Sequence, residues 1–157
     1  MLYKGLALAL FLSSCSTIDL NSALYNAEIT TTLKTPYQKE EFSTIDWELK
    51  KLFTSENPAR KCNIEIGITK TTLNSGISST QFAVNKNISI KVQYTIKCND
   101  GLQTTNTVMQ STDLTLQQEQ TVAQYIGERK ISRELCLQIA KSIHDEVKMF
   151  FATNIKN

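Results

Sequence analysis

The sequence is poor in the side chains that enzymes use for catalysis. Among 157 residues there is one histidine, His144, and only five glycines, none of them in a phosphate-binding glycine-rich loop. The carboxylates are scattered, and the adjacent Asp145 and Glu146 are best explained as part of a solvated helix face. Catalysis requires a nucleophile with its base, paired acids or a metal cluster. We therefore expect His144 to be a helix-surface residue, and the protein to be no enzyme and to bind no cofactor.

Cysteine is scarce too, and its spacing does not favour a metal site. The four cysteines include no C-x-x-C pair. A zinc site would have to combine Cys62, Cys98, Cys136 and His144 from distant parts of the chain. The sequence therefore predicts no metal centre.

Neither sign of charge dominates the composition. The chain has 17 basic and 15 acidic side chains, which give a net charge of +2. Such a balance produces no broad basic field, so nucleic acid is not an expected partner. With 41% hydrophobic residues, the chain suits one globular domain and is too short for two separate cores.

The N-terminal residues have the pattern of a bacterial lipoprotein signal rather than of a folded segment. Lys4 supplies a positive charge, residues 6–12 form an apolar run too short to span a bilayer, and small residues precede Cys15. The segment Leu-Ser-Ser-Cys resembles a lipobox, which implies removal of residues 1–14 and lipidation of Cys15. The alternative is an ordinary signal peptide with a coincidental cysteine.

A lipidated Cys15 would hold the protein at a membrane, because several acyl chains on one residue form a stable anchor. Residues 15–21 then serve as a tether, and residues 22–157 form the single domain. Ser16 stands where an aspartate would resemble an inner-membrane retention signal. The expected location is the outer membrane, with the lipid-anchored domain facing the periplasm.

Two segments with a two-residue hydrophobic period predict the central strands of a sheet. Their apolar sides consist of Cys62, Ile64, Ile66 and Ile68 in the first segment, and of Ile88, Ile90, Val92, Tyr94, Ile96 and Cys98 in the second. A β-branched alternation over residues 25–33 predicts an earlier strand. The polar stretch 74–87 is expected to be a loop that is partly paired at its base.

The hairpin signal Asn99-Asp100-Gly101 predicts a type I′ turn and, after it, a fourth strand over about residues 103–112. This strand has a weak pattern that suggests an exposed position at an edge. Thr115 with Gln118 then predicts the capping box of a long C-terminal helix, in which Gly127 permits a bend.

An earlier helix is predicted to begin at Thr35, with Pro36 at its first position and Gln38 in a capping box. It should end before Pro58. Both helices have an apolar stripe that can cover the sheet. The predicted fold is α+β: a two-layer sandwich with a four-stranded, largely antiparallel sheet and two helices on one face, in the order βαβββα.

Cys62 and Cys98 are expected on one face, at the open end of the central hairpin. Once Cys15 is lipidated, three cysteines remain in a compartment that permits disulfides. A Cys62–Cys98 disulfide and two small buried hydrophobic side chains are both compatible with this pattern.

Residues 63–150 resemble the lipopolysaccharide-assembly lipoprotein family LptE, in its shorter α-proteobacterial type. The strands NIEIGI and ISIKVQYTI, the short turn, a Thr-rich fourth strand and a closing helix with YIGERK and IAKSI follow in the family's order and spacing. The lipobox fits as well. The chain departs from the family at Ser16-Thr17-Ile18, where members often carry glycine and an aromatic residue.

The resemblance implies an outer-membrane lipoprotein that partners the large β-barrel LptD, sits partly in its lumen and assists lipopolysaccharide transport to the cell surface. The alternative is a generic periplasm-facing envelope lipoprotein that acts as a structural or protein-binding module. Lys86, Lys91 and Lys97 are the candidate residues for binding lipopolysaccharide or the partner, because lipopolysaccharide carries phosphates. Lysines on an exposed strand also serve solubility.

Overall fold

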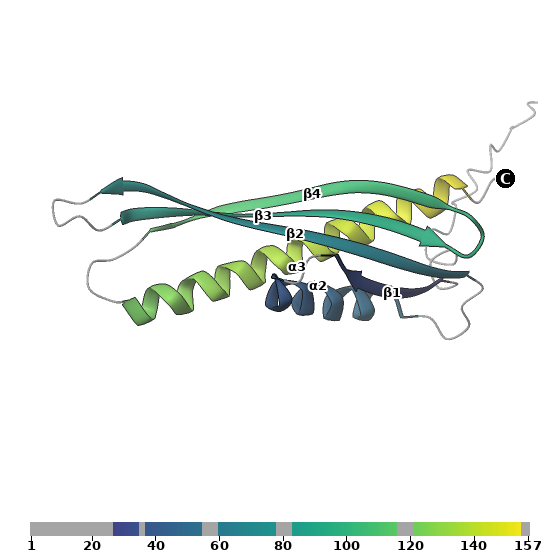
Figure 1. Ribbon diagram of the computed structural model, residues 1–157, viewed down its shortest axis with the longest axis horizontal. Coiled ribbons are helices and arrows are strands. Elements are labelled where there is room, and N and C mark those ends of the chain that lie inside the picture. Colours follow the sequence, from purple (N-terminus) through teal and green to yellow (C-terminus); the bar gives the residue numbers. More distant parts are fainter. Residues whose placement is uncertain (1–26, 35–36, 55–59, 78–82, 116–120, 155–157) are drawn as a thin grey trace, which may run out of the picture.

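The computed structural model describes residues 27–34, 37–54, 60–77, 83–115 and 121–154. Figure 1 shows a sheet in one layer and two helices along one of its faces. The elements are β1 (Ala27–Leu33), α2 (Lys39–Leu52), β2 (Arg60–Ile77), β3 (Ala83–Cys98), β4 (Gln103–Thr115) and α3 (Thr121–Asn154). The α+β class and the order βαβββα are therefore confirmed.

The four strands lie in the sheet in their order along the chain, β1-β2-β3-β4. The pairs β2–β3 and β3–β4 are antiparallel, and β1 is parallel to β2. A parallel pair needs a crossover between its strands, and α2 provides it. β4 is an edge strand, as its weak hydrophobic pattern suggested.

The alternating pattern of β2 and β3 separates a buried face from an open one, as predicted. Ile64 and Ile66 of β2 and Ile88, Ile90, Val92 and Ile96 of β3 have no exposed surface. Each fully buried aliphatic side chain of this size contributes about 1.5–3 kcal/mol relative to an exposed one. The buried face is therefore the main source of stability in the sheet.

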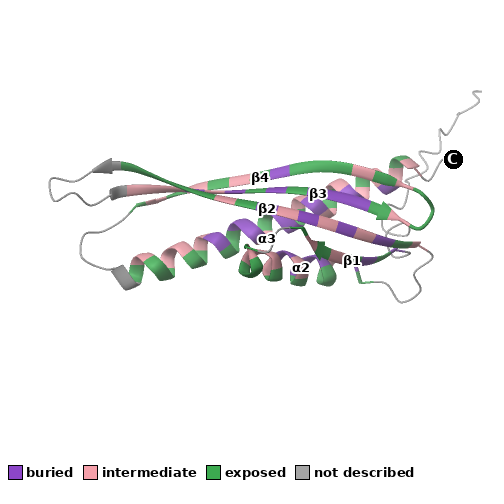
Figure 2. Cartoon of the chain, viewed as in Figure 1, coloured by how far each residue is buried: buried purple, intermediate pink, exposed green. Residues whose placement is uncertain are grey.

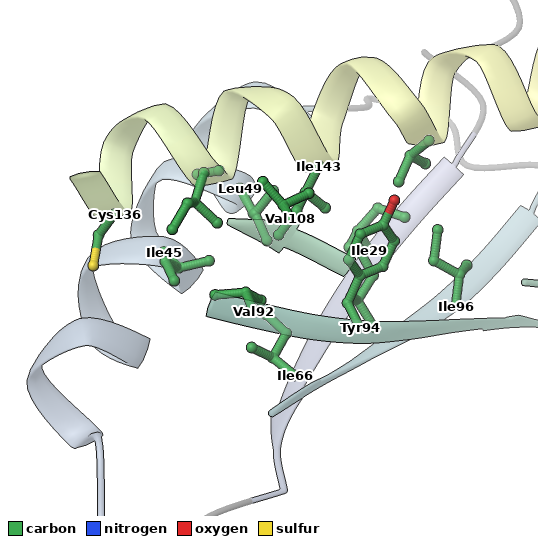
Figure 3. Close-up of a cluster of buried hydrophobic side chains, with 14 of the residues drawn as sticks. Ile29, Ile45, Leu49, Ile66, Val92, Tyr94, Ile96, Val108, Cys136 and Ile143 are labelled. Atoms are coloured by element: carbon green, nitrogen blue, oxygen red, sulfur yellow. The ribbon is translucent and has the colours of Figure 1, made fainter. Parts of the chain in front are cut away.

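The two helices complete the core with side chains at three- and four-residue steps. α2 buries Ile45 and Leu49, and α3 buries Leu135, Cys136, Ile139, Ala140, Ile143, Val147 and Phe151. Figure 3 shows side chains from the sheet and from both helices meeting between the layers. The amphipathic stripes read from the sequence are the surfaces that cover the sheet.

The start of α2 differs from the prediction. The helix begins at Lys39, and Gln38 is the residue before it, with no side-chain capping bond. The backbone is still attached to the sheet at Lys34, whose N–H donates to the carbonyl of Ile66 over 2.8 Å. The helix therefore starts at Lys39 rather than at Pro36, and Thr35 and Pro36 themselves lie outside the described residues. The end at Leu52, before Pro58, agrees with the prediction.

The β2–β3 hairpin is much longer than its hydrophobic pattern indicated. Residues 74–87 were expected to form a loop that is partly paired at its base; this pairing is confirmed and continues as far as Ile77 opposite Ala83. Polar residues on both sides of a strand give no hydrophobic period, so the sequence pattern ends before the backbone pairing does. The two strands continue beyond the apolar segments by backbone hydrogen bonds.

Two details of the C-terminal half also differ from the prediction. The turn after β3 has the three-residue loop Asn99–Gly101, in which the Gly101 N–H donates to the Cys98 carbonyl over 3.1 Å and Gly101 has a φ of 84°. This arrangement replaces the expected two-residue turn. Thr115 ends β4, paired with Asn85, and does not cap a helix; α3 starts at Thr121 and continues through Gly127.

Candidate functional site

The sheet face opposite the helices carries mostly hydroxyl and amide side chains. Figure 2 shows exposed and half-buried positions along this surface, which neither helix covers. Across β2, β3 and β4 the register aligns Gly67 with Gln93 and Thr107, and Thr71 with Ser89 and Ser111. We call this surface the open face; its described members include Thr30, Thr32, Asn63, Glu65, Thr69, Thr71, Ser89, Lys91, Gln93, Thr95, Lys97, Thr105, Thr107, Met109 and Ser111.

Hydrogen bonds between side chains order much of the open face. The Oγ1 atoms of Thr30 and Thr32 donate to the Asn63 amide oxygen over 3.1 and 3.0 Å. The hydroxyls of Thr95 and Thr105 lie 3.0 Å apart on neighbouring strands. Such cross-strand pairs stabilise the neighbouring strands on this polar surface.

Lys97 lies on the open face but is held by a carboxylate. Its Nζ is 2.7 Å from Glu65 Oε1, and Lys34 Nζ is 3.0 Å from Glu65 Oε2. The hydrogen bonds from Lys97 and Lys34 lower the pKa of the Glu65 carboxyl. Lys97 therefore belongs to a local charge cluster rather than to a free basic patch.

The structure does not bring the three candidate lysines together. Lys86 lies two residues before Ile88 along β3 and therefore on the same side of the sheet, which faces the helices. There it pairs with Glu128 of α3. Lys91 lies on the open face between Thr69 and Met109, exposed and with no ion pair among the described residues. Among the three, only Lys91 offers an ammonium group that no carboxylate holds.

A disulfide joins Cys62 and Cys98 at the end of β2 and β3, with Cα atoms 4.0 Å apart. The neighbouring Asn99 N–H donates to the Lys61 carbonyl over 2.9 Å. The two cysteines therefore form the adjacent non-hydrogen-bonded pair, in which Cα atoms come closest in an antiparallel ladder. An ion pair lies at the same end, with Arg60 Nε 2.6 Å from Asp100 Oδ2.

His144 and Glu146 are less exposed than a solvated helix face would require. The His144 ring packs edge-on against Phe53, with ring centroids 4.9 Å apart. Glu146 accepts hydrogen bonds from the Tyr94 hydroxyl and, over 2.7 Å, from the Asn106 amide. Burial, together with Glu146, raises the pKa of Tyr94. Only Asp145 remains largely in solvent, so the prediction for Glu146 is wrong: the carboxylate links α3 to the sheet.

A groove of about 700 Å³ lies between α2, the first half of α3 and Lys70 of β2. Trp47, Tyr125 and Ile126 line it with exposed aromatic and apolar surface. The fully buried Cys136 lies behind this lining, and burial raises the pKa of its thiol to about 12. The periodicity of the sequence did not predict the groove. The one feature of the sequence that could have indicated it is the presence of large apolar residues outside the buried stripes.

Several expectations concern residues that the structure does not describe. Cys15, the signal peptide 1–14 and the tether 15–21 all lie outside the described residues. Within the described ranges, no helix is long and apolar enough to cross a membrane. The same part of the chain contains no cluster of three potential metal ligands, and Cys62 and Cys98 are bonded to each other.

Comparison with known proteins gives a fold likeness without a sequence match. No family model and no curated protein matches the chain significantly. Rare lipoprotein B of Shewanella oneidensis is similar in structure, with a TM-score of 0.63, 10% identity, and coverage of 84% of this chain and 100% of that one.

Two other solved structures give the same result. A minor lipoprotein from Acinetobacter baumannii has a TM-score of 0.56 at 10% identity, covering 80% of this chain and 92% of that one. A lipoprotein B from Nitrosomonas europaea has a TM-score of 0.58 at 12% identity, covering 83% and 86%. The chain thus shares the fold of bacterial lipoproteins.

Proposed function

We propose that the protein is an outer-membrane lipoprotein, anchored through Cys15 and facing the periplasm, that partners an LptD-like β-barrel. In this role it assists lipopolysaccharide assembly and transport to the cell surface, without catalysis and without a cofactor. The lipobox-like segment before Cys15 and the fold shared with bacterial lipoproteins support this proposal.

The observation that carries the barrel partnership is the open face. Its hydroxyl and amide groups can exchange hydrogen bonds with another polar surface, and large membrane barrels have polar lumens. The apolar stripes of both helices and the buried face of the sheet are occupied by the core, whereas the open face is a broad polar surface that neither helix covers. The hydroxyl and amide side chains of the open face argue against an acyl-chain site on this side.

The alternative is a generic envelope lipoprotein that acts as a structural or protein-binding module in the periplasm. It would use the same open face against a different protein. The two functions differ in the partner recovered, so a purification experiment separates them.

We expect the tagged lipoprotein, at native expression and in mild detergent, to co-purify with a large outer-membrane β-barrel. The double substitution Gln93→Glu and Thr107→Glu should reduce recovery of the barrel at least tenfold. These two residues are paired on the open face, and unpaired carboxylates are costly to bury in an interface. The measurement is the amount of barrel per amount of lipoprotein eluted.

The matched control introduces two carboxylates elsewhere, with Ala123→Glu and Gln138→Glu on exposed positions of α3. This variant should recover as much barrel as the unchanged protein. Recovery of the lipoprotein alone would support the generic module, and equal losses in both variants would rule out the open face as the contact.

For lipopolysaccharide itself, we expect the contact at Lys91. Lys91→Ala should weaken binding of purified lipopolysaccharide by about tenfold, the effect of losing one charge-assisted hydrogen bond. Lys86→Ala and Lys97→Ala should have smaller effects, because carboxylates already hold these lysines. Lys141→Ala, an exposed lysine on α3, is the control. Unchanged affinity in Lys91→Ala, measured by surface plasmon resonance, would reject this assignment.

A further inference from the structure

The groove between α2 and α3 has a polar floor and an apolar rim. At the floor, Ser132 is 5% exposed, and its buried Oγ has no hydrogen-bond partner among the described residues. Lys70 lines the same groove, and its Nζ lies 2.9 Å from Glu41 Oε1. At the rim, Trp47 and Tyr125 are more than half exposed. A buried hydroxyl without a partner is costly, so the floor is suited to a ligand with hydrogen-bonding groups.

The groove also has more positive than negative charge. Its two carboxylates are already paired, Glu41 with Lys70 and Glu40 with Arg129, whose Nε lies 2.9 Å from Glu40 Oε1. Lys130 and Arg133 line the same groove, are exposed, and have no ion-pair partner within the described part of the chain. The ligand should therefore carry a negative charge.

The arrangement disfavours an acyl chain and a peptide. An acyl chain would leave the Ser132 hydroxyl unpaired and would lie against an ion pair, which is the reverse of an apolar pocket. An extended peptide gains affinity from main-chain hydrogen bonds, but here both walls are helices, whose backbone groups are used internally. A docked amphipathic helix needs an apolar groove.

We propose that this groove binds an anionic sugar. Lys51 Nζ lies over one face of the Trp47 ring, 5.4 Å from its centroid, and the guanidinium carbon of Arg129 lies over one face of the Tyr125 ring at 5.9 Å. The ring faces that these cations leave uncovered offer flat surfaces for the C–H faces of sugar rings, while Ser132 meets a hydroxyl. Arg133 and Lys130 bind the carboxylate group of the sugar. A guanidinium binds such a group with two parallel hydrogen bonds. This site is separate from the open face and does not depend on the barrel partnership.

The chain contains its own reporter for this binding, because Trp47 is the only tryptophan in the sequence and lines the groove. The full-length protein in a detergent without a sugar headgroup is titrated with trigalacturonic acid while tryptophan fluorescence is followed. We expect a saturable change in intensity or wavelength. Maltotriose, a neutral sugar of the same length, should bind at least tenfold more weakly.

Two variants and a control locate the site. Arg133→Gln should raise the dissociation constant for trigalacturonic acid about tenfold, and Ser132→Ala about threefold. Lys141→Gln, an exposed position of α3 outside the groove, should leave it unchanged. Circular dichroism confirms that each variant is folded.

Several outcomes would overturn the proposal. These are no saturable signal from Trp47, equal affinity for maltotriose, or an Arg133→Gln variant that binds as well as the unchanged protein. Tighter binding of dodecyl phosphate or of a glutamate-rich peptide would assign the groove to an amphiphile or a protein instead. Since barrel recovery is measured on the open-face variants, its failure and the failure of this proposal are distinguishable.

Discussion

Replacing Cys62 and Cys98 together with alanine is expected to lower the free energy of unfolding by about 3–4 kcal/mol. The disulfide joins residues 36 positions apart, so it restricts a long loop in the unfolded chain. It also closes the end of the β2–β3 ladder where Arg60 pairs with Asp100. Urea unfolding followed by far-ultraviolet circular dichroism measures the change.

A reductant provides the matched control for this prediction. Dithiothreitol should destabilise the unchanged protein to about the level of the double variant, and should have little effect on the variant itself. The remaining cysteine, Cys136, is buried in the core and is present in both proteins. Equal unfolding midpoints for the variant and the oxidised protein would contradict a stabilising role for the disulfide.

Phe151→Ala is expected to cost about 3–5 kcal/mol, because it removes a fully buried aromatic ring near the end of α3. The ring lies 5.8 Å from that of Phe150, and the guanidinium carbon of Arg60 is 5.0 Å from its centroid. The loss would leave a cavity between α3 and the start of β2. For a domain with a typical stability of about 5–15 kcal/mol, this is a large fraction.

Met149, two residues away on the same helix, provides the control, because it is 62% exposed. Met149→Ala should change the stability by no more than about 0.5 kcal/mol. Chemical unfolding of both variants gives the comparison. If Phe151→Ala were no worse than Met149→Ala, the last turns of α3 would not be part of the core.

The division between the two faces explains why stability and recognition can be tested separately. Substitutions at Gln93 and Thr107 change exposed side chains of the open face. The disulfide and Phe151 belong to the packed side of the sheet and its end. A variant that loses the barrel but keeps its unfolding midpoint therefore reports on recognition alone.

The candidate site was predictable only in part. The strand period correctly placed Lys91 and Lys97 on the polar side of β3. It placed Lys86 at the start of the strand but did not show which face Lys86 occupies, because the hydrophobic pattern begins only at Ile88. Nor did it show that Glu65 and Glu128 would hold two of the three lysines, since these contacts join distant segments.

The sequence by itself determined which sides of the strands and helices are buried, and thereby the two-layer fold. The two-residue period of β2 and β3 and the helical period of α3 are local properties of the sequence. They identify the apolar side of each element, and the hydrophobic effect buries that side. The absence of a dominant charge and the position of Cys15 after an apolar segment are likewise properties of the sequence alone.

Tertiary structure alone decided the length of the β2–β3 hairpin, the first residues of α2 and α3, and the groove between the two helices. Each depends on backbone pairing or packing between segments far apart in the chain, such as Lys34 with Ile66, Asn85 with Thr115, and Arg129 with Glu40. Where a segment has polar residues on all its sides, it has no hydrophobic period from which its pairing partners could be predicted. They are fixed only when hydrogen bonds form between the folded segments.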